Sequence, residues 1–391
     1  MNVLTLTNLY PSAARPGHGL FVEQRMVRWA ARTGGMLRVV APVPWFPFRR
    51  GFGSYSAFAR TPPREERKGV VVFHPRVLIL PKIGMGLAPS AWVAACEPVL
   101  ADLHRSQPIQ ILDCHYLYPD AVAGAELARR LRIPFVMSAR GSDVNVIGSI
   151  EGPRRRIVEA ASRASAVIAV SGALAEKLRS MGVASEKIHV IQNGVDVDRF
   201  APRSHTSAEK PAEGRLLLGV GRLVRGKGFH VALEAMARLL PEFPDLVLVL
   251  AGEGPERSAL EAAARAHGIS DRLRLLGEVP HDRIPSLLWQ AHRFLLPSFH
   301  EGYPNVVVEA IAAGCPVVAT AVGGIPEIVD PELGDLASRA NDAGALESAL
   351  RTSLRRNFDP AAFARKRDEL RWDPLIDRLH SVFERAVAGA A

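Results

Sequence analysis

The chain has 391 residues, about twice the usual length of one compact domain, so two domains are expected. Hydrophobic residues make up 48% and charged residues 23%, a globular composition that excludes a disordered or fibrous chain. The formal net charge is +9, and the whole excess lies in the first half, because residues 1–200 contain 26 Lys and Arg against 15 Asp and Glu whereas residues 201–391 contain 23 against 25.

The basic first half has three interpretations: a solvated basic face, attraction to anionic lipid or an anionic acceptor, and nucleic-acid binding. The last is the least favoured, and we expect no nucleic-acid partner. The three cysteines are widely spaced, which excludes a disulfide scaffold and a zinc ribbon and is typical of a reducing compartment. The longest apolar stretches have about eight residues, against roughly 20 in a membrane-spanning helix. The N-terminus lacks the features of a signal peptide, so we expect a cytoplasmic protein.

Short apolar segments alternate with amphipathic ones, which predicts parallel sheets with helices on both faces. The strands predicted in the first half are Asn2–Thr7, Leu37–Ala41, Val70–Phe73, Ile109–Cys114, Phe135–Ser138, Ala166–Val170 and His189–Ile191. The helices predicted there are Phe21–Arg32, Pro89–Ser106, Asp120–Leu131 and Leu174–Met181. The polar stretch Arg203–Gly214 contains no large apolar residue and is the best linker in the chain.

The same pattern restarts after this linker. The predicted strands are Arg215–Val220, Leu246–Ala251, Leu273–Leu276, Phe294–Pro297 and Val317–Thr320. The predicted helices are Val231–Leu240, Arg257–Ala266, Ile284–Gln290, Val306–Ala313 and, near the end of the chain, Leu375–Ala388. Two successive doubly wound α/β units are the simplest interpretation, with ligands at the carboxyl ends of the strands.

A glycine-rich loop with cations follows the first strand of the second half: Gly221-Arg222-Leu223-Val224-Arg225-Gly226-Lys227-Gly228. It nearly matches the P-loop pattern, but Gly228 stands where a magnesium-binding hydroxyl belongs. A glycine loop with cations before a helix is suited to a diphosphate, because backbone N–H groups and the helix N-terminus add positive potential. The alternative is an ordinary turn with surface cations.

A second motif runs Ser298-Phe299-His300-Glu301-Gly302-Tyr303-Pro304-Asn305-Val306-Val307-Val308-Glu309-Ala310-Ile311. Glu301 is predicted in a loop, and Pro304 or Asn305 is predicted to open a helix whose first N–H groups suit phosphate oxygens. Glu309 then falls in the second turn among apolar residues, where a carboxylate is buried only if something donates hydrogen bonds to it. A sugar diol such as ribose would do so, and the alternative is a solvent-facing Glu.

Glu301-x7-Glu309, with Gly302-Tyr303-Pro304 inside it, resembles the EX7E signature of the retaining glycosyltransferases of family GT4. Other segments similar to that family stand in the same order, and the resemblance runs from about Asn8 to Trp372. They are Arg140-Gly141-Ser142-Asp143-Val144, Val170-Ser171, Asn193-Gly194-Val195-Asp196, Gly221-Arg222, Lys227-Gly228, Ala251-Gly252-Glu253-Gly254-Pro255, Ala313-Gly314-Cys315-Pro316-Val317-Val318-Ala319-Thr320 and Gly323-Gly324-Ile325-Pro326-Glu327.

The resemblance implies a GT-B fold, in which two Rossmann-like doubly wound parallel-sheet domains face each other across a cleft. We place the acceptor-binding domain at 1–198 and the nucleotide-sugar-binding domain at 199–372, with 373–391 as a C-terminal helix that can cross back to the first domain. The implied activity is transfer of a sugar, with retention, from a nucleoside-diphosphate sugar to a carbohydrate or lipid-linked acceptor. Cell-envelope or surface polysaccharide synthesis is the expected setting.

The resemblance also implies roles for individual donor-site residues. Arg222 and Lys227 would neutralise the diphosphate and the leaving nucleotide, a task that other enzymes give to a metal. Glu309 would hold the ribose hydroxyls and Glu301 the sugar ring. The other implied donor residues are Gly302, Tyr303, Pro304, Asn305 and Val306 at the sugar and phosphate, and Gly252, Gly254 and Val279 at the base.

Three features of the first half complete the predicted site. Gly17 and Gly19 lie in a loop after the first strand, where glycines let the backbone approach a ligand, although a plain turn is the alternative. His115 follows a strand, and similar enzymes have a His there that contacts the donor sugar; a structural His is the alternative. Arg140 and Asp143 come from another strand end and are candidates for acceptor binding, since a cation there suits an anionic acceptor.

Asp196-Val197-Asp198 matches the metal-binding DxD of a different glycosyltransferase fold. Here it follows Asn193-Gly194, a turn similar to the family's interdomain hinge, so we interpret it as structural. We expect no metal and no other cofactor, with the nucleotide sugar as donor substrate.

The aromatic run Pro44-Trp45-Phe46-Pro47-Phe48-Arg49-Arg50-Gly51-Phe52 and the cluster Arg154-Arg155-Arg156 have open interpretations. The run could line an acceptor pocket, touch a membrane surface or be buried against its own domain. We hypothesise that the first domain contacts anionic membranes. Two rival functions remain, another GT-B enzyme such as a nucleotide-sugar epimerase, and a basic polyanion-binding protein without catalysis.

Overall fold

The computed structural model describes residues 1–45, 58–78, 85–202 and 214–390, and the chain forms two compact units. Unit 1 comprises Met1–Asn193 and Trp372–Ala391, and unit 2 comprises Gly194–Arg371. The division lies five residues before the expected one at 198, because Val195, Val197 and Phe200 are buried in the core of unit 2. The expected linker lies outside the described residues, apart from Gly214.

Unit 1 is built on an eight-stranded sheet in the order β10-β9-β8-β7-β1-β2-β5-β4, in which only β4 runs antiparallel to its neighbour. The strands are β1 (Asn2–Leu6), β2 (Met36–Val40), β4 (Arg64–Arg67), β5 (Val70–Phe73), β7 (Ile111–His115), β8 (Phe135–Ala139), β9 (Ala166–Ala169) and β10 (Ile188–Val190). The seven predicted strands are present, each within two residues of its predicted bounds. A separate parallel pair, β3 (Val43–Trp45) and β6 (Arg76–Leu78), was not predicted.

Most of the described helices of unit 1 pack against its sheet. They are α1 (Leu20–Thr33), α3 (Ala88–Ser106), α4 (Val122–Leu131), α5 (Ser142–Asn145), α6 (Glu151–Arg163), α7 (Gly172–Met181) and α15 (Trp372–Ala388). In α1, Val22, Met26 and Trp29 follow the helical period and are fully buried. The helix predicted to start at Asp120 starts at Val122 instead, because a kinked turn with an extended residue occupies Leu117–Ala121.

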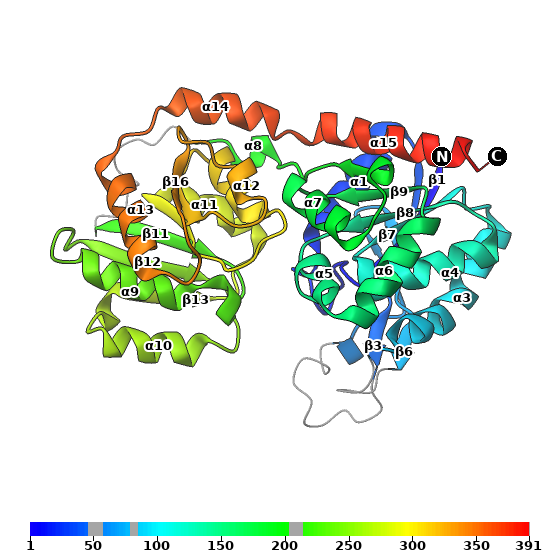
Figure 1. Cartoon of the computed structure of the whole chain (residues 1–391), viewed down its shortest axis with the longest axis horizontal. Coiled ribbons are helices and arrows are strands. Elements are labelled where there is room, and N and C mark those ends of the chain that lie inside the picture. The colour runs from blue at the N-terminus through cyan, green and yellow to red at the C-terminus, as the bar shows by residue number, and fades with distance from the viewer. Residues whose placement is uncertain (46–57, 79–84, 203–213, 391) are drawn as a thin grey trace. The chain divides into compact units, whose positions relative to one another are not determined.

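The last helix of the chain, α15, packs on unit 1. Figure 1 shows this red helix beside the blue α1. Phe383 is fully buried and meets Trp29 of α1 edge to face, with ring centroids 5.8 Å apart. Leu379 and Ile376 lie on the same buried face of α15. The buried face of α15 therefore packs against the first sheet.

Unit 2 contains a six-stranded, all-parallel sheet in the order β13-β12-β11-β14-β15-β16, the doubly wound arrangement. Its strands are β11 (Arg215–Val220), β12 (Leu246–Ala251), β13 (Leu273–Gly277), β14 (Arg293–Leu296), β15 (Val317–Thr320) and β16 (Gly334–Ala337). The chain order reverses between β11 and β14, which are neighbours in the sheet. In such sheets ligands bind outside the carboxyl ends of the strands at this switch point.

Helices cover both faces of the second sheet. They are α8 (Val197–Phe200), α9 (Phe229–Leu239), α10 (Arg257–Ala266), α11 (Ile284–Gln290), α12 (Asn305–Ala312), α13 (Ala343–Arg355) and α14 (Pro360–Glu369). One apolar core joins α9, α10 and α13 to the sheet, and a second joins α8, α11, α12 and α14. The strand β16 and the helices α13 and α14 were not predicted.

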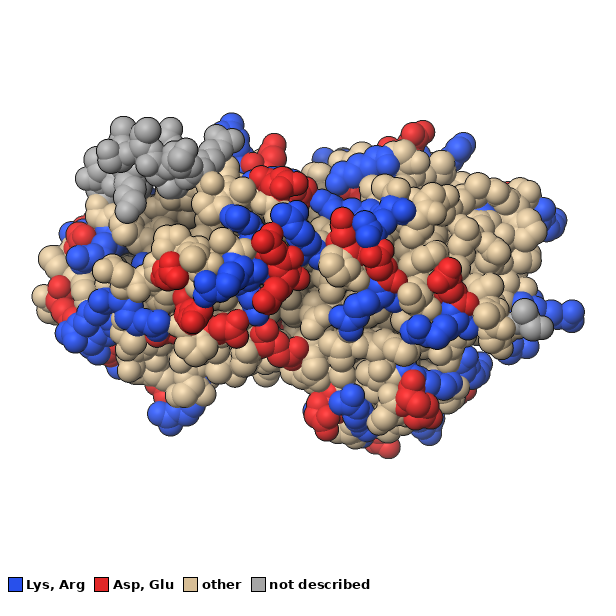
Figure 2. All heavy atoms as spheres, turned by 90° about the horizontal axis from the view of Figure 1, so that it is seen from above, with Lys and Arg blue, Asp and Glu red and all other residues tan. Residues whose placement is uncertain are grey.

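Charged side chains of both signs are interspersed on the face of the molecule that Figure 2 shows. Many cations of the described chain are in ion pairs, such as Arg32 with Asp377 at 2.5 Å in unit 1 and Lys366 with Asp330 at 2.9 Å in unit 2. Pairing of this kind reduces the local positive field. Among the described helices, none has the length and apolarity needed to cross a bilayer.

Candidate active site

The loops after β11 and β12 touch through their glycines at the carboxyl edge of the unit 2 sheet. Gly252 has φ +154°, and a Cβ there would lie 2.8 Å from the carbonyl carbon of Gly221. A Cβ on Gly254 would lie 2.7 Å from the carbonyl carbon of Leu223. The N–H of Leu223 donates to the carbonyl oxygen of Glu253 at 3.0 Å. The two loops therefore form one backbone platform, and only glycine fits where they meet.

The cationic loop is also joined to the loop after β14, across the switch point. Its last turn, Arg225–Lys227, ends at Gly228, where φ is +68° and α9 follows. A Cβ on Gly228 would lie 2.9 Å from the carbonyl carbon of Pro297. The N–H of Phe299 donates to the carbonyl oxygen of Gly226 at 2.8 Å. These contacts bring the glycine-rich loop at residues 221–228 next to the loop that begins the EX7E motif.

Two cations were predicted at the diphosphate. Lys227 forms an ion pair with Glu301, and Arg222 is exposed. The Nζ of Lys227 donates to Oε1 of Glu301 at 2.6 Å, and both side chains are largely buried. Glu301 itself is held by its neighbours, because a Cβ on Gly323 (φ +54°) would lie 2.8 Å from its carbonyl carbon. The first Glu of the EX7E motif and the lysine of the glycine loop thus form one ion pair.

The second Glu of the motif lies where the sequence placed it, in the second turn of α12. Pro304 precedes this helix and Asn305 is its first residue. Glu309 is only 7% exposed, and its Oε1 accepts a hydrogen bond from Nε2 of His281 at 2.8 Å. Its Oε2 is buried without a hydrogen-bond partner among the described residues. Because a carboxylate only accepts, the imidazole carries its hydrogen on Nε2.

The remaining predicted donor residues lie around this core. Tyr303, Val306 and Val279 are partly buried against the apolar cluster that contains α12, and burial raises the pKa of the Tyr303 phenol. Gly302 is buried, and its carbonyl oxygen accepts from the N–H of Gly324 at 3.1 Å. His281, two residues after Val279, was not predicted; nothing in its sequence context distinguishes it from a surface histidine.

In unit 1, His115 is the last residue of β7 and is fully buried. Its Nε2 donates to Oδ2 of Asp113 at 2.6 Å, and its Nδ1 accepts from the guanidinium of Arg140. Burial lowers the pKa of His115 to about 4, with the Asp113 charge opposing and the Arg140 charge reinforcing this shift. The ring is therefore neutral at pH 7, and both of its nitrogens are engaged within the protein.

The two acceptor candidates differ in their surroundings. The Asp143 carboxylate is fully buried and accepts from the backbone N–H groups of Leu117 at 2.9 Å, Gly141 at 2.7 Å and Arg140 at 3.0 Å. It thus closes the turn between β8 and α5, and burial raises its pKa. Arg140 is partly exposed and donates from Nη1 to Oδ1 of Asn193 at 3.2 Å.

A second arginine supports this cluster. Arg25 of α1 is fully buried and donates to the carbonyl oxygen of Ile191 and to Oδ1 of Asn193, at 2.8 and 3.0 Å. Burial lowers the pKa of Arg25 to about 10, and its charge helps to lower the pKa of Arg140. Arg25 was not predicted, because its partners Ile191 and Asn193 are more than 160 positions away in the chain. Asp113 was not predicted either, although His115 is only two positions away.

The predicted glycine loop of unit 1 is anchored from two sides. Gly19 has φ +71°, and a Cβ there would lie 2.8 Å from the backbone nitrogen of Tyr10; Gly17 is exposed. His18 donates from Nε2 to the carbonyl oxygen of Asn8 at 3.0 Å. The N–H of Asn8 donates at 2.6 Å to the buried carboxyl of Asp120.

Three other features lie away from these clusters. Asp196 caps α8 by accepting from the N–H of Arg199 at 3.2 Å, which gives the DxD sequence a structural role. In the aromatic run, Pro44 and Trp45 end β3, and residues 46–52 lie outside the described residues.

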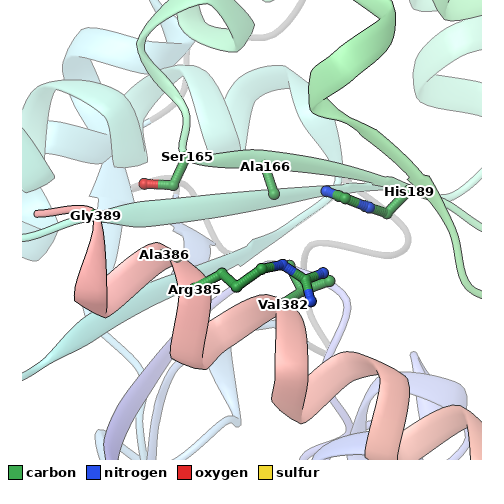
Figure 3. A pocket seen from close by; sticks show the side chains of 7 residues that line it. All are labelled: Ser165, Ala166, His189, Val382, Arg385, Ala386 and Gly389. Carbon is green, nitrogen blue, oxygen red and sulfur yellow. The ribbon is translucent and has the colours of Figure 1, made fainter.

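A pocket of about 260 Å³ lies between β9, β10 and α15, where Figure 3 shows His189 and Arg385. Ala166 in its lining is the first residue of β9, so this pocket lies at the amino end of that strand, unlike the clusters above.

Comparison with known proteins places the chain in a family. Residues 201–368 match the model for glycosyl transferases group 1, and residues 49–199 match the model for glycosyltransferase family 4. The Bacillus subtilis protein named as the teichuronic acid biosynthesis glycosyltransferase TuaC is 32% identical over 338 residues, which cover 84% of this chain and 83% of that protein.

Solved structures share the fold at lower identity. Sucrose-phosphate synthase from Thermosynechococcus elongatus superposes with a TM-score of 0.79 at 21% identity, over 99% of both chains. HepE of Anabaena in complex with UDP superposes with a TM-score of 0.73 at 20% identity, over 98% of this chain and 100% of that chain. These likenesses confirm the predicted GT-B fold. The chain belongs to the family 4 glycosyltransferases of the group 1 type.

Proposed function

We propose that the protein transfers a sugar, with retention of anomeric configuration, from a nucleoside-diphosphate sugar to a carbohydrate or lipid-linked acceptor. The observation that supports this proposal is the 2.6 Å contact between Lys227 and Glu301 at the switch point of unit 2. It unites the cation suited to a diphosphate with the carboxylate that the EX7E resemblance assigns to the sugar ring. HepE has been solved with UDP and with UDP-glucose, and TuaC is named for teichuronic acid biosynthesis.

In this proposal the chain's own cations stabilise the leaving group. Negative charge grows on the diphosphate as the glycosidic bond breaks, and Lys227 and Arg222 meet that charge with no metal required. The first turn of α12 adds backbone N–H groups near Asn305, at the positive end of the helix dipole. Glu301 accepts from hydroxyls of the sugar when Lys227 turns to the phosphate.

We assign the acceptor-facing role in unit 1 to Arg140. His115 and Asp143 are fully buried, with their polar atoms engaged inside the protein, so they position Arg140 rather than touch substrate. Arg140 is the partly exposed residue of the three, and its charge suits an acceptor that carries a carboxylate or a phosphate.

Thermal unfolding in millimolar UDP, GDP, ADP and UMP, with and without EDTA, tests the donor site. A ligand at 100-fold its dissociation constant adds about 2.7 kcal/mol, which raises the midpoint of a unit of this size by about 5 to 10 °C. We expect one diphosphate to stabilise the protein, the monophosphate to do so less, and EDTA to change nothing. No shift with any of the diphosphates would refute the donor site, and loss of the shift in EDTA would refute metal independence.

Alanine substitution tests the two cations. We expect Lys227→Ala and Arg222→Ala each to lower kcat by about 10²–10³-fold while the protein stays folded. Arg225→Ala is the matched control, because Arg225 is an exposed cation in the same turn. Turnover of donor would be measured as release of the nucleoside diphosphate. Equal rates for all three variants and the wild type would contradict the assignment.

We also propose that unit 1 contacts the cytoplasmic surface of an anionic membrane. Large apolar side chains are exposed at residues 85–87 and just before α6: Met85, Leu87, Val146 and Ile150. Arg156 of α6 donates to the carbonyl oxygen of Gly86, which ties these two segments together. The exposed Arg154 and Arg155 stand beside it on α6, and apolar side chains with cations suit the lipid interface.

Vesicle pelleting tests this contact. At low salt we expect the protein to pellet with phosphatidylglycerol-containing vesicles and to stay in solution with pure phosphatidylcholine. A variant with Leu87→Ser, Arg154→Ser and Arg155→Ser should bind more weakly. Arg179→Ser, on the exposed side of α7, is the control. Equal pelleting with both kinds of vesicle, or no pelleting, would remove the proposal.

A further inference from the structure

The buried carboxylate of Glu309 has one oxygen engaged and one without a partner. His281 donates from Nε2 to Oε1 at 2.8 Å. Oε2 has less than 1 Å² of accessible surface and no hydrogen-bond partner among the described residues. A buried carboxylate oxygen without a donor is unfavourable, so a ligand hydroxyl that donates there would stabilise this group.

His281 is itself held in place by its surroundings. It begins a short turn, His281–Arg283, that connects β13 to α11. Its ring lies against Phe200 of α8, with the centroids 5.8 Å apart and the planes tilted by 56°. Phe200 is 1% exposed and belongs to the core of unit 2, so it gives the imidazole a fixed wall. A ring fixed in this way fixes the carboxylate to which it donates.

We propose that His281 is a positioning residue for recognition of the donor ribose. Its Nε2–H holds Oε1 of Glu309, so that the carboxylate keeps one orientation and Oε2 remains as the acceptor for a ribose hydroxyl. This inference rests on the proposed function, in which Glu309 accepts from the ribose of the nucleotide. His281 lies outside the EX7E motif, 28 positions before Glu309. In this inference the selectivity of the site for ribonucleotides depends on it.

The experiment compares two ligands by isothermal titration calorimetry: the nucleoside diphosphate that stabilises the wild type, and its 2′,3′-dideoxy form. The wild type should prefer the first by about tenfold or more, because a hydrogen bond to a charged group is worth at least that factor. His281→Leu should lower affinity for the ribonucleotide by a similar factor and leave affinity for the dideoxy form within about threefold, a pattern that general damage to the fold would not produce.

Two polar variants distinguish the hydrogen bond to Glu309 from the space that the His281 side chain fills. In His281→Gln the amide nitrogen occupies the place of Nε2, the same number of bonds from the backbone, so it should restore the preference for the ribonucleotide. His281→Asn keeps an amide but is too short to reach Glu309, and it should behave like His281→Leu. His267→Leu, at an exposed histidine after α10, is the control and should match the wild type.

The outcomes distinguish this inference from the function on which it rests. If the wild type binds no nucleoside diphosphate, the proposed donor site itself fails. If the wild type prefers the ribonucleotide and Glu309→Gln abolishes that preference, the donor site stands. Should His281→Leu and His281→Asn then keep the full preference, the positioning role of His281 is refuted.

Discussion

Replacement of Gly252 by alanine should disrupt the platform formed by the loops after β11 and β12. The new Cβ would lie 2.8 Å from the carbonyl carbon of Gly221, against at least 3.4 Å for an ordinary contact, so one loop must retreat by 0.6 Å or more. The φ of +154° adds strain for any residue with a Cβ. Strain and overpacking each contribute about 1–3 kcal/mol, so we expect a loss of about 4 kcal/mol.

The assay is thermal unfolding followed by nucleotide binding. Unit 2 has 178 residues, from 194 to 371, so a loss of this size lowers its midpoint by about 8 to 16 °C. Gly252→Ala should also bind the nucleoside diphosphate more weakly, because the platform borders the cationic loop. Gly226→Ala is the matched control, since a Cβ there meets nothing within 4 Å. If both variants unfold within 1 °C of the wild type, the argument from loop contact is wrong.

Three further predictions concern unit 1. Phe383→Ala should lower the free energy of unfolding in urea by about 3–5 kcal/mol, because it empties a fully buried ring site beneath α15; a loss below about 1 kcal/mol would contradict that packing. The unfolded state takes up a proton on His115 near pH 6.5 and the folded state only near pH 4, so stability falls as the pH drops through this window. As the pH falls, the free energy of unfolding of the wild type should therefore decrease by up to about 1.4 kcal/mol per pH unit more than that of His115→Gln. Parallel curves of unfolding free energy against pH for the two proteins would count against a buried neutral ring. Asp120→Ala should cost about 1–3 kcal/mol in urea unfolding because Asn8 and Trp92 lose their acceptor, whereas Asp120→Asn keeps that oxygen and should cost less; equal losses would contradict this.

The sheets and the donor loops could be predicted because their signals are local. Strands such as β12 are short apolar runs that end at a glycine, and the glycines and cations of residues 221–228 stand next to one another. The edge strand β4, with the sequence REER, has no apolar pattern because its burial is only partial, so it was missed. The helix α14 was missed for a similar reason, since few of its residues are buried.

The polar clusters could not be predicted because they depend on distant contacts. Arg25 meets the carbonyl oxygen of Ile191 across 166 positions of sequence. His281 sits in a polar turn, and only the fold brings it to Glu309. The position of His115 at a strand end could be predicted from the sequence, but the Asp113 carboxylate and the Arg140 guanidinium that engage its two ring nitrogens could not.

The return of α15 to unit 1 determines when that unit can finish folding during synthesis. Unit 2 is inserted between residue 193 and residue 372, so the ribosome makes 178 residues before it begins to make the helix that covers Trp29. At about 5–20 residues per second this delay is roughly 10 to 35 seconds. Throughout that interval the nascent first unit exposes the apolar surface that Ile376, Leu379 and Phe383 later bury. All residues of unit 2 are therefore synthesised before the helix that completes unit 1.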